Sequence, residues 1–348
     1  MCYMMISSSH LKNVSESLKY VWNGVLAAIL LLVITMTIGI PRALAYYRYG
    51  ILWETFFQEL GIPYLVSGET TEPILANGAG YTVDESCLPL KIYMGHARSL
   101  LDKCDVLLVP RLQRLGKRDE FCVRFWGLPD TVQSTFQGAT LLTYERTSGR
   151  RGAPAWAFLQ MAKSLGIGPR AAARAYRIAQ NRQREADYDR FARTRPLLRA
   201  RAPKILVAAQ SYISYDKRLG GTVARLLRSL GAAPVFIDAW NRNACHAAGN
   251  QTSKDLYWTL NREILGAIHL ARNQVDGIIL LTAFPCGSDC LANELVLRRV
   301  KNPPVIQIIL DEHQSHEGLT TRLESFLDMV AARKKAPVGA GSSRPPTT

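Results

Sequence analysis

The sequence predicts an α/β protein of two lobes, each built on a parallel sheet, joined by a basic helical segment. Short apolar runs alternate with helix-length periodic segments in residues 36–145, and the same alternation returns in residues 204–333. This alternation is typical of βαβ units. Between the two halves, residues 146–203 are helical in pattern and rich in arginine. A chain of 348 residues with 48% hydrophobic content has room for two cores of ordinary size.

The first lobe is expected to begin with a buried strand that leads into an aromatic helix. Apolar and aromatic residues recur at spacings of three and four from Leu44 to Leu60, which predicts a helix packed on a sheet, and Gly61 ends it. In chain order the expected elements are a strand at Thr37–Ile40, a helix from Pro41 to Leu60, a strand at Ile62–Val66, a polar loop at Ser67–Glu72, a helix from Cys87 to Asp102 and a strand at Val106–Val109.

The basic segment is predicted to be helical from about Thr131 to Pro203, with one long helix at Arg170–Arg195. Residues 146–204 hold thirteen arginines and two lysines against three acidic residues, so most of the formal net charge of +15 is concentrated there. A solvated helix face and docking on an acidic partner are both open interpretations. Nucleic-acid binding is disfavoured because no aromatic residues are interleaved for stacking on bases.

The second lobe repeats the pattern of the first. Its expected elements are strands at Lys204–Ala209, Ala233–Ile237, Gly277–Leu281 and Val305–Leu310, and helices at Gly221–Leu230, Ser253–Ala271, Asn293–Val300 and Leu319–Ala332. Residues 334–348 are rich in Pro, Gly, Ser and Thr, which predicts a disordered tail.

Residues 1–35 form an N-terminal extension with three open interpretations. Val25–Ile40 is almost wholly apolar and follows Lys12 and Lys19, as a membrane anchor would. The run also leads directly into the first strand, so a true start at Met36 would make residues 1–35 an upstream translation artefact. A folded extra helix is the third interpretation. We expect a cytoplasmic protein, with membrane anchoring through residues 25–40 as the alternative.

Three of the seven cysteines occupy similar places in the predicted lobes. Cys87 precedes Leu-Pro at the start of a helix, and Cys122 and Cys286 each follow an apolar strand-like run. Open α/β sheets place ligand sites beyond the carboxyl ends of their strands. We therefore hypothesise that these three thiols meet and hold an iron–sulfur cluster, since thiolates are the ligands that such clusters take. The alternative is that they are buried core thiols, which is common for free cysteine.

The other cysteines give weaker signals. Cys104 lies between a helix and a strand and is expected to be structural or exposed. Cys245 with His246 could ligate zinc, but no further ligands stand at finger-like spacing, which favours a surface loop. An odd number of cysteines without a dense pattern indicates a reducing compartment.

Several charged residues and histidines are candidates for work beside the cluster. His96 could hydrogen-bond the cluster or a substrate carbonyl, or be a buried histidine satisfied by a backbone carbonyl. Arg42 could meet an anion at a helix N-terminus, or pair with Glu54 or Asp84. Glu312 and His313, together with Asp311, end the last strand and are candidate acids or bases. The catalytic candidates are therefore His96, Glu312 and His313.

Residues 36–328 carry a series of motifs in a fixed order. They are Ile38-Gly39-Ile40-Pro41-Arg42, Leu52-Trp53-Glu54-Thr55-Phe56-Phe57, Asp84-Glu85-Ser86-Cys87-Leu88-Pro89, Gly95-His96, Val109-Pro110-Arg111, Gly127-Leu128-Pro129-Asp130, Ser211-Tyr212, Tyr215-Asp216, Phe284-Pro285-Cys286-Gly287, Asp311-Glu312-His313 and Thr321-Arg322-Leu323-Glu324. Together these motifs resemble one known family, the acyl-CoA dehydratase activase-related proteins. These are relatives of the 2-hydroxyacyl-CoA dehydratase subunits and of the double-cubane cluster proteins.

The resemblance implies two Rossmann-like lobes that hold a [4Fe-4S] or double-cubane cluster on Cys87, Cys122 and Cys286. It also implies low-potential electron transfer for ATP-coupled reductive or dehydratase chemistry, as in anaerobic metabolism. A separate ATP-hydrolysing activase would be the partner, because this chain has no phosphate-binding loop. A homodimer and a dehydratase-like partner subunit are also open, and the competing function is a non-catalytic scaffold or assembly protein without a working cluster.

The sequence departs from the family at three places. Val123 follows Cys122 where the family usually has proline, Gln210 stands where a histidine is common, and Cys290 is an additional thiol. These departures leave the type and the reactivity of the cluster open.

Overall fold

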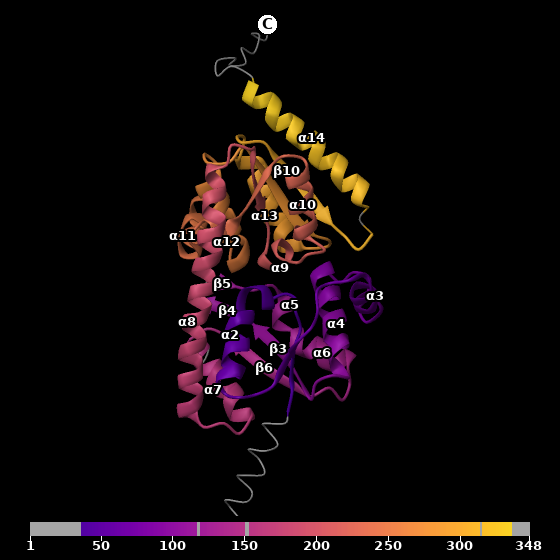
Figure 1. Ribbon diagram of the computed structural model, residues 1–348, viewed down its shortest axis with the longest axis vertical. Coiled ribbons are helices and arrows are strands. Elements are labelled where there is room, and N and C mark those ends of the chain that lie inside the picture. The colour runs from indigo at the N-terminus through magenta and orange to yellow at the C-terminus, as the bar shows by residue number, and fades with distance from the viewer. Residues whose placement is uncertain (1–35, 117–118, 150–152, 314, 336–348) are drawn as a thin grey trace, which may run out of the picture.

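The computed structural model describes residues 36–116, 119–149, 153–313 and 315–335. It confirms the predicted fold class, with two parallel sheets flanked by helices and stacked as two lobes along the long axis (Figure 1). The predicted extension at residues 1–35 and most of the predicted tail lie outside the described residues. Within them, no helix has both the length and the apolar character that a membrane crossing requires.

The first lobe contains a four-stranded sheet in the order β2-β1-β3-β6. Every strand pair in it is parallel. The strands are β1 (Ile38–Ile40), β2 (Tyr64–Val66), β3 (Val106–Leu112) and β6 (Leu141–Arg146). The helices are α2 (Tyr46–Glu59), α3 (Glu72–Gly80), α4 (Leu88–Leu101), α5 (Val123–Trp126) and α6 (Leu128–Thr135), and a hairpin of β4 (Arg114–Gly116) and β5 (Asp119–Glu120) precedes α5.

The second lobe contains a parallel sheet in the order β10-β9-β7-β8. Its strands are β7 (Lys204–Ala208), β8 (Ala233–Phe236), β9 (Gly277–Ala283) and β10 (Val305–Leu310). Its helices are α9 (Ser211–Ser214), α10 (Gly220–Ser229), η3 (Ile237–Ala239), α11 (Arg242–Thr252), α12 (Thr259–Ala271), α13 (Gly287–Arg299) and α14 (His316–Lys335). Every residue of β9 is buried, as expected for a parallel strand covered by helices on both faces.

Both sheets reverse their strand order at the same point. In each lobe the second strand lies on one side of the first and the third strand on the other, so β1 meets β3 and β7 meets β9 at a switch point. Ligands of open α/β sheets bind outside the carboxyl ends of the strands at this point. The segments after β1, β3, β7 and β9 are therefore the natural places for a site.

The basic segment forms two helices that pack against the first lobe and one short helix beyond them. These are α7 (Pro154–Ser164), α8 (Pro169–Thr194) and η2 (Arg195–Arg199). The ring of Phe158 in α7 lies 4.5 Å from that of Phe56 in α2 and 5.2 Å from that of Tyr144 in β6. Figure 1 shows α8 along one edge of the molecule, beside both lobes.

Three local predictions were wrong. Leu141–Arg146, expected to be helical, is strand β6, whose six residues pair with β3 from Leu107 to Leu112. Cys245 and His246, expected in a surface loop, lie in helix α11, where Cys245 is buried. The last helix continues to Lys335, past the predicted start of the disordered tail.

Close helix packing in each lobe depends on glycine. A Cβ on Gly95 of α4 would stand 1.9 Å from the carbonyl oxygen of Ile74 in α3. A Cβ on Gly266 of α12 would stand 1.6 Å from the carbonyl oxygen of Cys245 in α11. Only glycine lets these backbones approach so closely.

Candidate functional site

The three predicted ligand cysteines all occupy the same structural position. Cys87, Cys122 and Cys286 are the N-cap residues of α4, α5 and α13, and each has an extended backbone conformation. Each side chain is half-buried, and none is in a disulfide. A helix N-terminus presents backbone N–H groups and a partial positive charge, which favours an anion such as a thiolate.

The two lobes meet where these cysteines lie. The backbone N–H of Leu88, next to Cys87, donates to the carbonyl of Phe284, two residues before Cys286, with a distance of 2.9 Å. Cys122 is close enough to Cys87 and to Cys286 for charge on one thiol to raise the pKa of the other. The structure thus brings together three thiols from distant parts of the chain.

Burial is the main influence on all three thiols. It raises the pKa of Cys87, Cys122 and Cys286, and backbone N–H groups in the first turn of each helix partly oppose that effect. Without a cation, the thiols are therefore protonated at neutral pH. Among the described residues, no three histidine, cysteine or carboxylate side chains are grouped to ligate a single metal ion.

Tyr212 of α9 lies beside the three cysteines. Its ring is 6.0 Å from that of Phe125 in α5, which places it at the contact between the lobes. Burial raises the pKa of its hydroxyl well above the ordinary value, and Asp289 and the three thiols raise it further. The hydroxyl therefore remains protonated and can donate a hydrogen bond.

Asp289 is a buried carboxylate in the first turn of α13, only 4% exposed. One of its oxygens accepts hydrogen bonds from Gln210 at 3.1 Å and Asn261 at 2.6 Å, and the other accepts from Thr282 at 2.8 Å. All three donors are neutral. The negative charge of Asp289 raises the pKa of Cys286, Cys122 and Cys87, so this corner of the second lobe carries a charge that favours a cation nearby.

His96 belongs to a second buried network between the lobes. Its Nε2 lies 3.0 Å from the hydroxyl of Thr70, which in turn donates to Asp216 of the second lobe. Tyr47 also donates to Asp216, at 3.0 Å. Because Thr70 gives its proton to Asp216, it accepts from His96 Nε2–H, and the buried Nδ1 has no partner. His96 therefore helps to join the lobes, through a hydroxyl and not through a backbone carbonyl.

Three charged candidates, Glu312, His313 and Arg42, have different partners and different exposure. Glu312 forms an ion pair at 3.0 Å with Lys91, a residue of α4 whose side chain is 7% exposed. His313 is 89% exposed and lies 3.6 Å from Glu312. Arg42 pairs with Glu69 at 3.7 Å, rather than with either partner that the sequence suggested. Glu312 thus ties the second lobe to the helix that begins at Cys87.

The other cysteines of the described residues are Cys104, Cys245 and Cys290, and they differ in burial. Cys104 packs against Gly39, where a Cβ would stand 2.5 Å from its sulfur. His246 lies 2.8 Å from Asp119, which also accepts from Arg262 at 2.7 Å. Cys290 is exposed one turn along α13.

Sequence reasoning missed the part of the site that is made by the second lobe. Asp289, Asn261 and Thr282 were not among the predicted residues, although Gln210 was noted. A carboxylate in the first turn of a helix is ordinarily a solvated N-terminal charge. The available signal was its position, three residues after a cysteine that follows the apolar run Gly277–Leu281.

Comparisons with known proteins agree with part of this description. The family described as the CoA enzyme activase uncharacterised domain (DUF2229) matches residues 37–239. No curated protein matches the chain.

Solved structures give only distant likenesses. The SBP FpvC of Pseudomonas aeruginosa in complex with Mn²⁺ has 12% identity and a TM-score of 0.28 over 86% of this chain and 99% of that one. A Zn(II)-bound mutant variant of AdcAII of Streptococcus pneumoniae has 9% identity and a TM-score of 0.24 over 85% of this chain and 98% of that one. A sugar transporter of Clostridium phytofermentans has 10% identity and a TM-score of 0.19 over 87% and 94%. Likenesses this low carry no argument about the present chain.

Proposed function

The chain belongs to the CoA enzyme activase uncharacterised domain family (DUF2229), and from this premise we propose that it is an iron–sulfur protein that passes low-potential electrons in ATP-coupled reductive or dehydratase chemistry. Cys87, Cys122 and Cys286 would be the ligands. The observation that carries the proposal is that these three cysteines, from both lobes, cap three helices whose N-termini meet where the lobes join.

The chemistry of the site supports a cationic group there. Three thiols and the carboxylate of Asp289 stand together, and the hydrogen-bond donors to that carboxylate are all neutral. If the thiols ionised without a cation, several negative charges would share a half-buried space, which is strongly unfavourable. Bound iron would remove this penalty, because its positive charge would offset the charge of the thiolates, whose protons would pass to the solvent.

Three cysteines that come from three different helices are a ligand set that a cluster can use. A cluster spreads its irons over several ångströms, and each cysteine binds a different iron. When bound on three cysteines, such a cluster supplies one-electron transfer and one iron open to an exogenous ligand.

The residues of the chain would do three things around that group. The helix N-termini at the three cysteines would stabilise the anionic thiolates. The protonated hydroxyl of Tyr212 would donate a hydrogen bond toward the sulfurs. The Lys91–Glu312 pair, and the amide of Leu88 on the carbonyl of Phe284, would keep the thiols of the two lobes at a fixed separation.

A separate ATP-hydrolysing activase is the partner that we propose, because the chain carries no nucleotide loop of its own. Such a partner would supply the electron that the cluster receives. A dehydratase-like subunit would then be the electron acceptor.

Anoxic reconstitution tests the proposal. Purified protein is incubated with ferrous iron and sulfide, desalted, and measured for iron, acid-labile sulfide, visible absorption and electron paramagnetic resonance after reduction. We expect about three to four irons per chain and a signal from a reduced cluster. Fewer than about one iron per chain would contradict it.

The competing function is a scaffold or assembly protein that keeps the fold without a cluster. The lack of a single-ion site among the described residues is the observation that favours it. The same iron measurement separates the two functions, because a scaffold remains colourless after reconstitution.

A further inference from the structure

The exposed face of α8 carries a symmetric pattern of charge. Six positions along it, separated by four, four, three, four and four residues, fall on one side of the helix. Five are exposed and one is half-buried; they are Arg170, Arg174, Ile178, Asn181, Glu185 and Asp189. We call this row the α8 seam. The opposite face holds the buried Ala172, Ala175 and Ala179, which pack toward the protein.

From its N-terminal to its C-terminal end, the charge along the α8 seam is first positive, then neutral, then negative. It is also symmetric about the middle of the helix, between Ala179 and Gln180. Two such helices crossing antiparallel at that point would place Arg170 opposite Asp189 of the other copy, and Arg174 opposite Glu185. Ile178 would lie opposite Asn181. A twofold-symmetric interface requires this kind of self-complementary surface.

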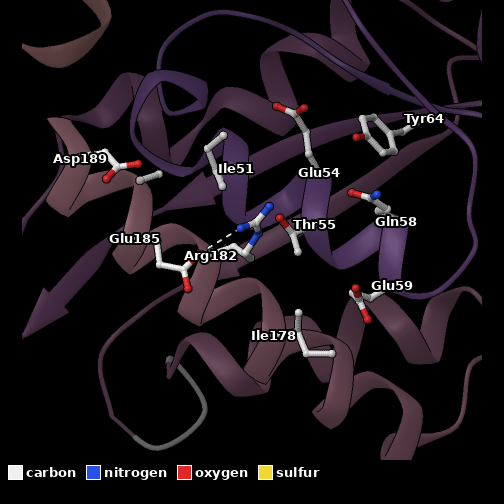
Figure 2. Close-up of a pocket in the computed structure, with 11 residues that line it drawn as sticks. Ile51, Glu54, Thr55, Gln58, Glu59, Tyr64, Ile178, Arg182, Glu185 and Asp189 are labelled. Carbon is white, nitrogen blue, oxygen red and sulfur yellow. Dashed lines mark hydrogen bonds and ion pairs between the residues drawn. The ribbon is translucent and has the colours of Figure 1, made fainter.

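The acidic half of the seam borders a hollow between α2 and α8. The hollow has a volume of about 420 Å³ and is lined by Glu54, Glu59, Glu185 and Asp189, with Arg182 as its cation. Figure 2 shows Arg182 paired with Glu185 and the other carboxylates arranged around the same space. Burial raises the pKa of Glu54, which indicates that this carboxylate lacks enough compensating positive charge.

We propose that α8 is the interface of a homodimer, in which Arg170 and Arg174 of one copy enter the acidic hollow of the other. Guanidinium groups bind carboxylates in a planar, two-point geometry, so two arginines can share the four carboxylates of one hollow. Because the dimer is twofold-symmetric, the same contact between arginines and hollow forms twice. Arg177 and Arg184, on the flank of the seam, remain in solvent, where like charges are screened. This inference does not depend on the cluster.

The dimer is expected to be moderate in strength and sensitive to salt. Its contacts are mainly between exposed charges, which are screened once the Debye length falls below about 10 Å at ionic strengths above 0.1 M. We therefore expect the dissociation constant to increase at least about tenfold between about 50 mM and 500 mM NaCl.

A charge-swap experiment on the full chain tests the interface. Sedimentation velocity is measured on the wild type, on Arg170→Glu/Arg174→Glu, and on Glu185→Arg/Asp189→Arg, at low and high salt. The wild type should be dimeric at low salt, and each variant alone should be monomeric because its seam carries one sign of charge. An equimolar mixture of the two variants should form a heterodimer, since the acidic seam of one then faces the basic seam of the other.

Matched controls separate this interface from general charge effects. Arg199→Glu/Arg201→Glu makes the same change in net charge as Arg170→Glu/Arg174→Glu, at exposed residues outside the α8 seam, and should leave the dimer intact. Thermal melting of every variant reports whether it is folded. A wild type that stays monomeric at low salt would overturn the proposal. So would folded variants that remain dimeric alone, or that fail to associate when mixed. Loss of DNA or RNA binding in Arg170→Glu/Arg174→Glu, with no dimer in the wild type, would instead assign the basic half to nucleic acid.

Discussion

The two lobes share one strand order but contribute different chemistry to the place where they meet. The first lobe supplies two thiols, on α4 and α5, from an aromatic core. The second supplies one thiol on α13, together with a buried carboxylate held by three neutral donors. The first lobe therefore provides two of the three sulfur atoms, and the second lobe provides the third sulfur atom and the buried carboxylate. Neither lobe alone holds all three cysteines and Asp289.

Removing individual thiols should have the largest effect, and tests whether both lobes contribute ligands. On the proposed function, Cys87→Ser, Cys122→Ser and Cys286→Ser should each lose at least about half of the reconstituted iron, because a hydroxyl is a poor replacement for a soft sulfur ligand. Iron and sulfide content of the reconstituted variants provide the measurement. Cys104→Ser is the matched control and should bind as much iron as the wild type. Full iron in Cys286→Ser would leave the second lobe without a ligand.

Breaking the buried ion pair between the lobes should cost about 3–5 kcal/mol of unfolding free energy. Arg48 of α2 makes two hydrogen bonds of 2.8 Å to Glu263 of α12, and both side chains are about 10% exposed. Arg48→Met would leave Glu263 buried without its main partner. Urea unfolding measures the loss. Arg98→Met, which removes an exposed ion pair with Asp102, should cost much less; equal losses in the two variants would contradict this account.

The buried carboxylate is the feature that most distinguishes the second lobe. Asp289→Ala leaves the donors of Gln210, Asn261 and Thr282 without their acceptor and should destabilise the protein by about 3 kcal/mol. The exposed Asp130 is the control, and Asp130→Ala should cost less than about 1 kcal/mol. Denaturant unfolding of both variants measures the two losses in the free energy of unfolding. A neutral effect of Asp289→Ala would mean that its three hydrogen bonds contribute no net stability.

Much of this architecture was predictable from sequence because strands and helices here have the periods that parallel sheets require. The exceptions have physical causes. Leu141–Arg146 begins with two apolar residues and ends with two charged ones, so it lacks a clear strand pattern, and its strand conformation comes from pairing with β3. Helix α11 has few apolar residues, and its contact with α12 depends on glycines. The burial of Asp289 comes from donors on other segments, which no local pattern reveals.

The first lobe has its own buried titratable group, and it predicts a smaller, pH-dependent effect. Burial and the nearby Arg42 lower the pKa of His96 to about 4. In the unfolded chain the pKa is about 6.5, so the unfolded state binds the proton more tightly. The contribution of His96 to the free energy of unfolding is therefore complete above pH 6.5 and is lost as the pH falls toward 4. Between pH 7 and pH 5 the wild type should lose about 2 kcal/mol through His96.

Unfolding in urea at both pH values measures that loss, and His96→Asn should abolish this part of it. His313→Asn, at a histidine that is 89% exposed, should leave the pH dependence unchanged. An unaltered pH dependence in His96→Asn would contradict the assignment of this loss to His96.

Gly95 has a consequence for how this protein can change. It lies about 12 Å along α4 from Cys87 at 1.5 Å per residue, with no room for even a methyl group against Ile74. Any larger side chain there would push α4 away from α3 and so displace Cys87 at its N-terminus, although the substitution is remote from the proposed metal ligands. Loss of reactivity in a natural or engineered variant could therefore begin at a residue that performs no chemistry.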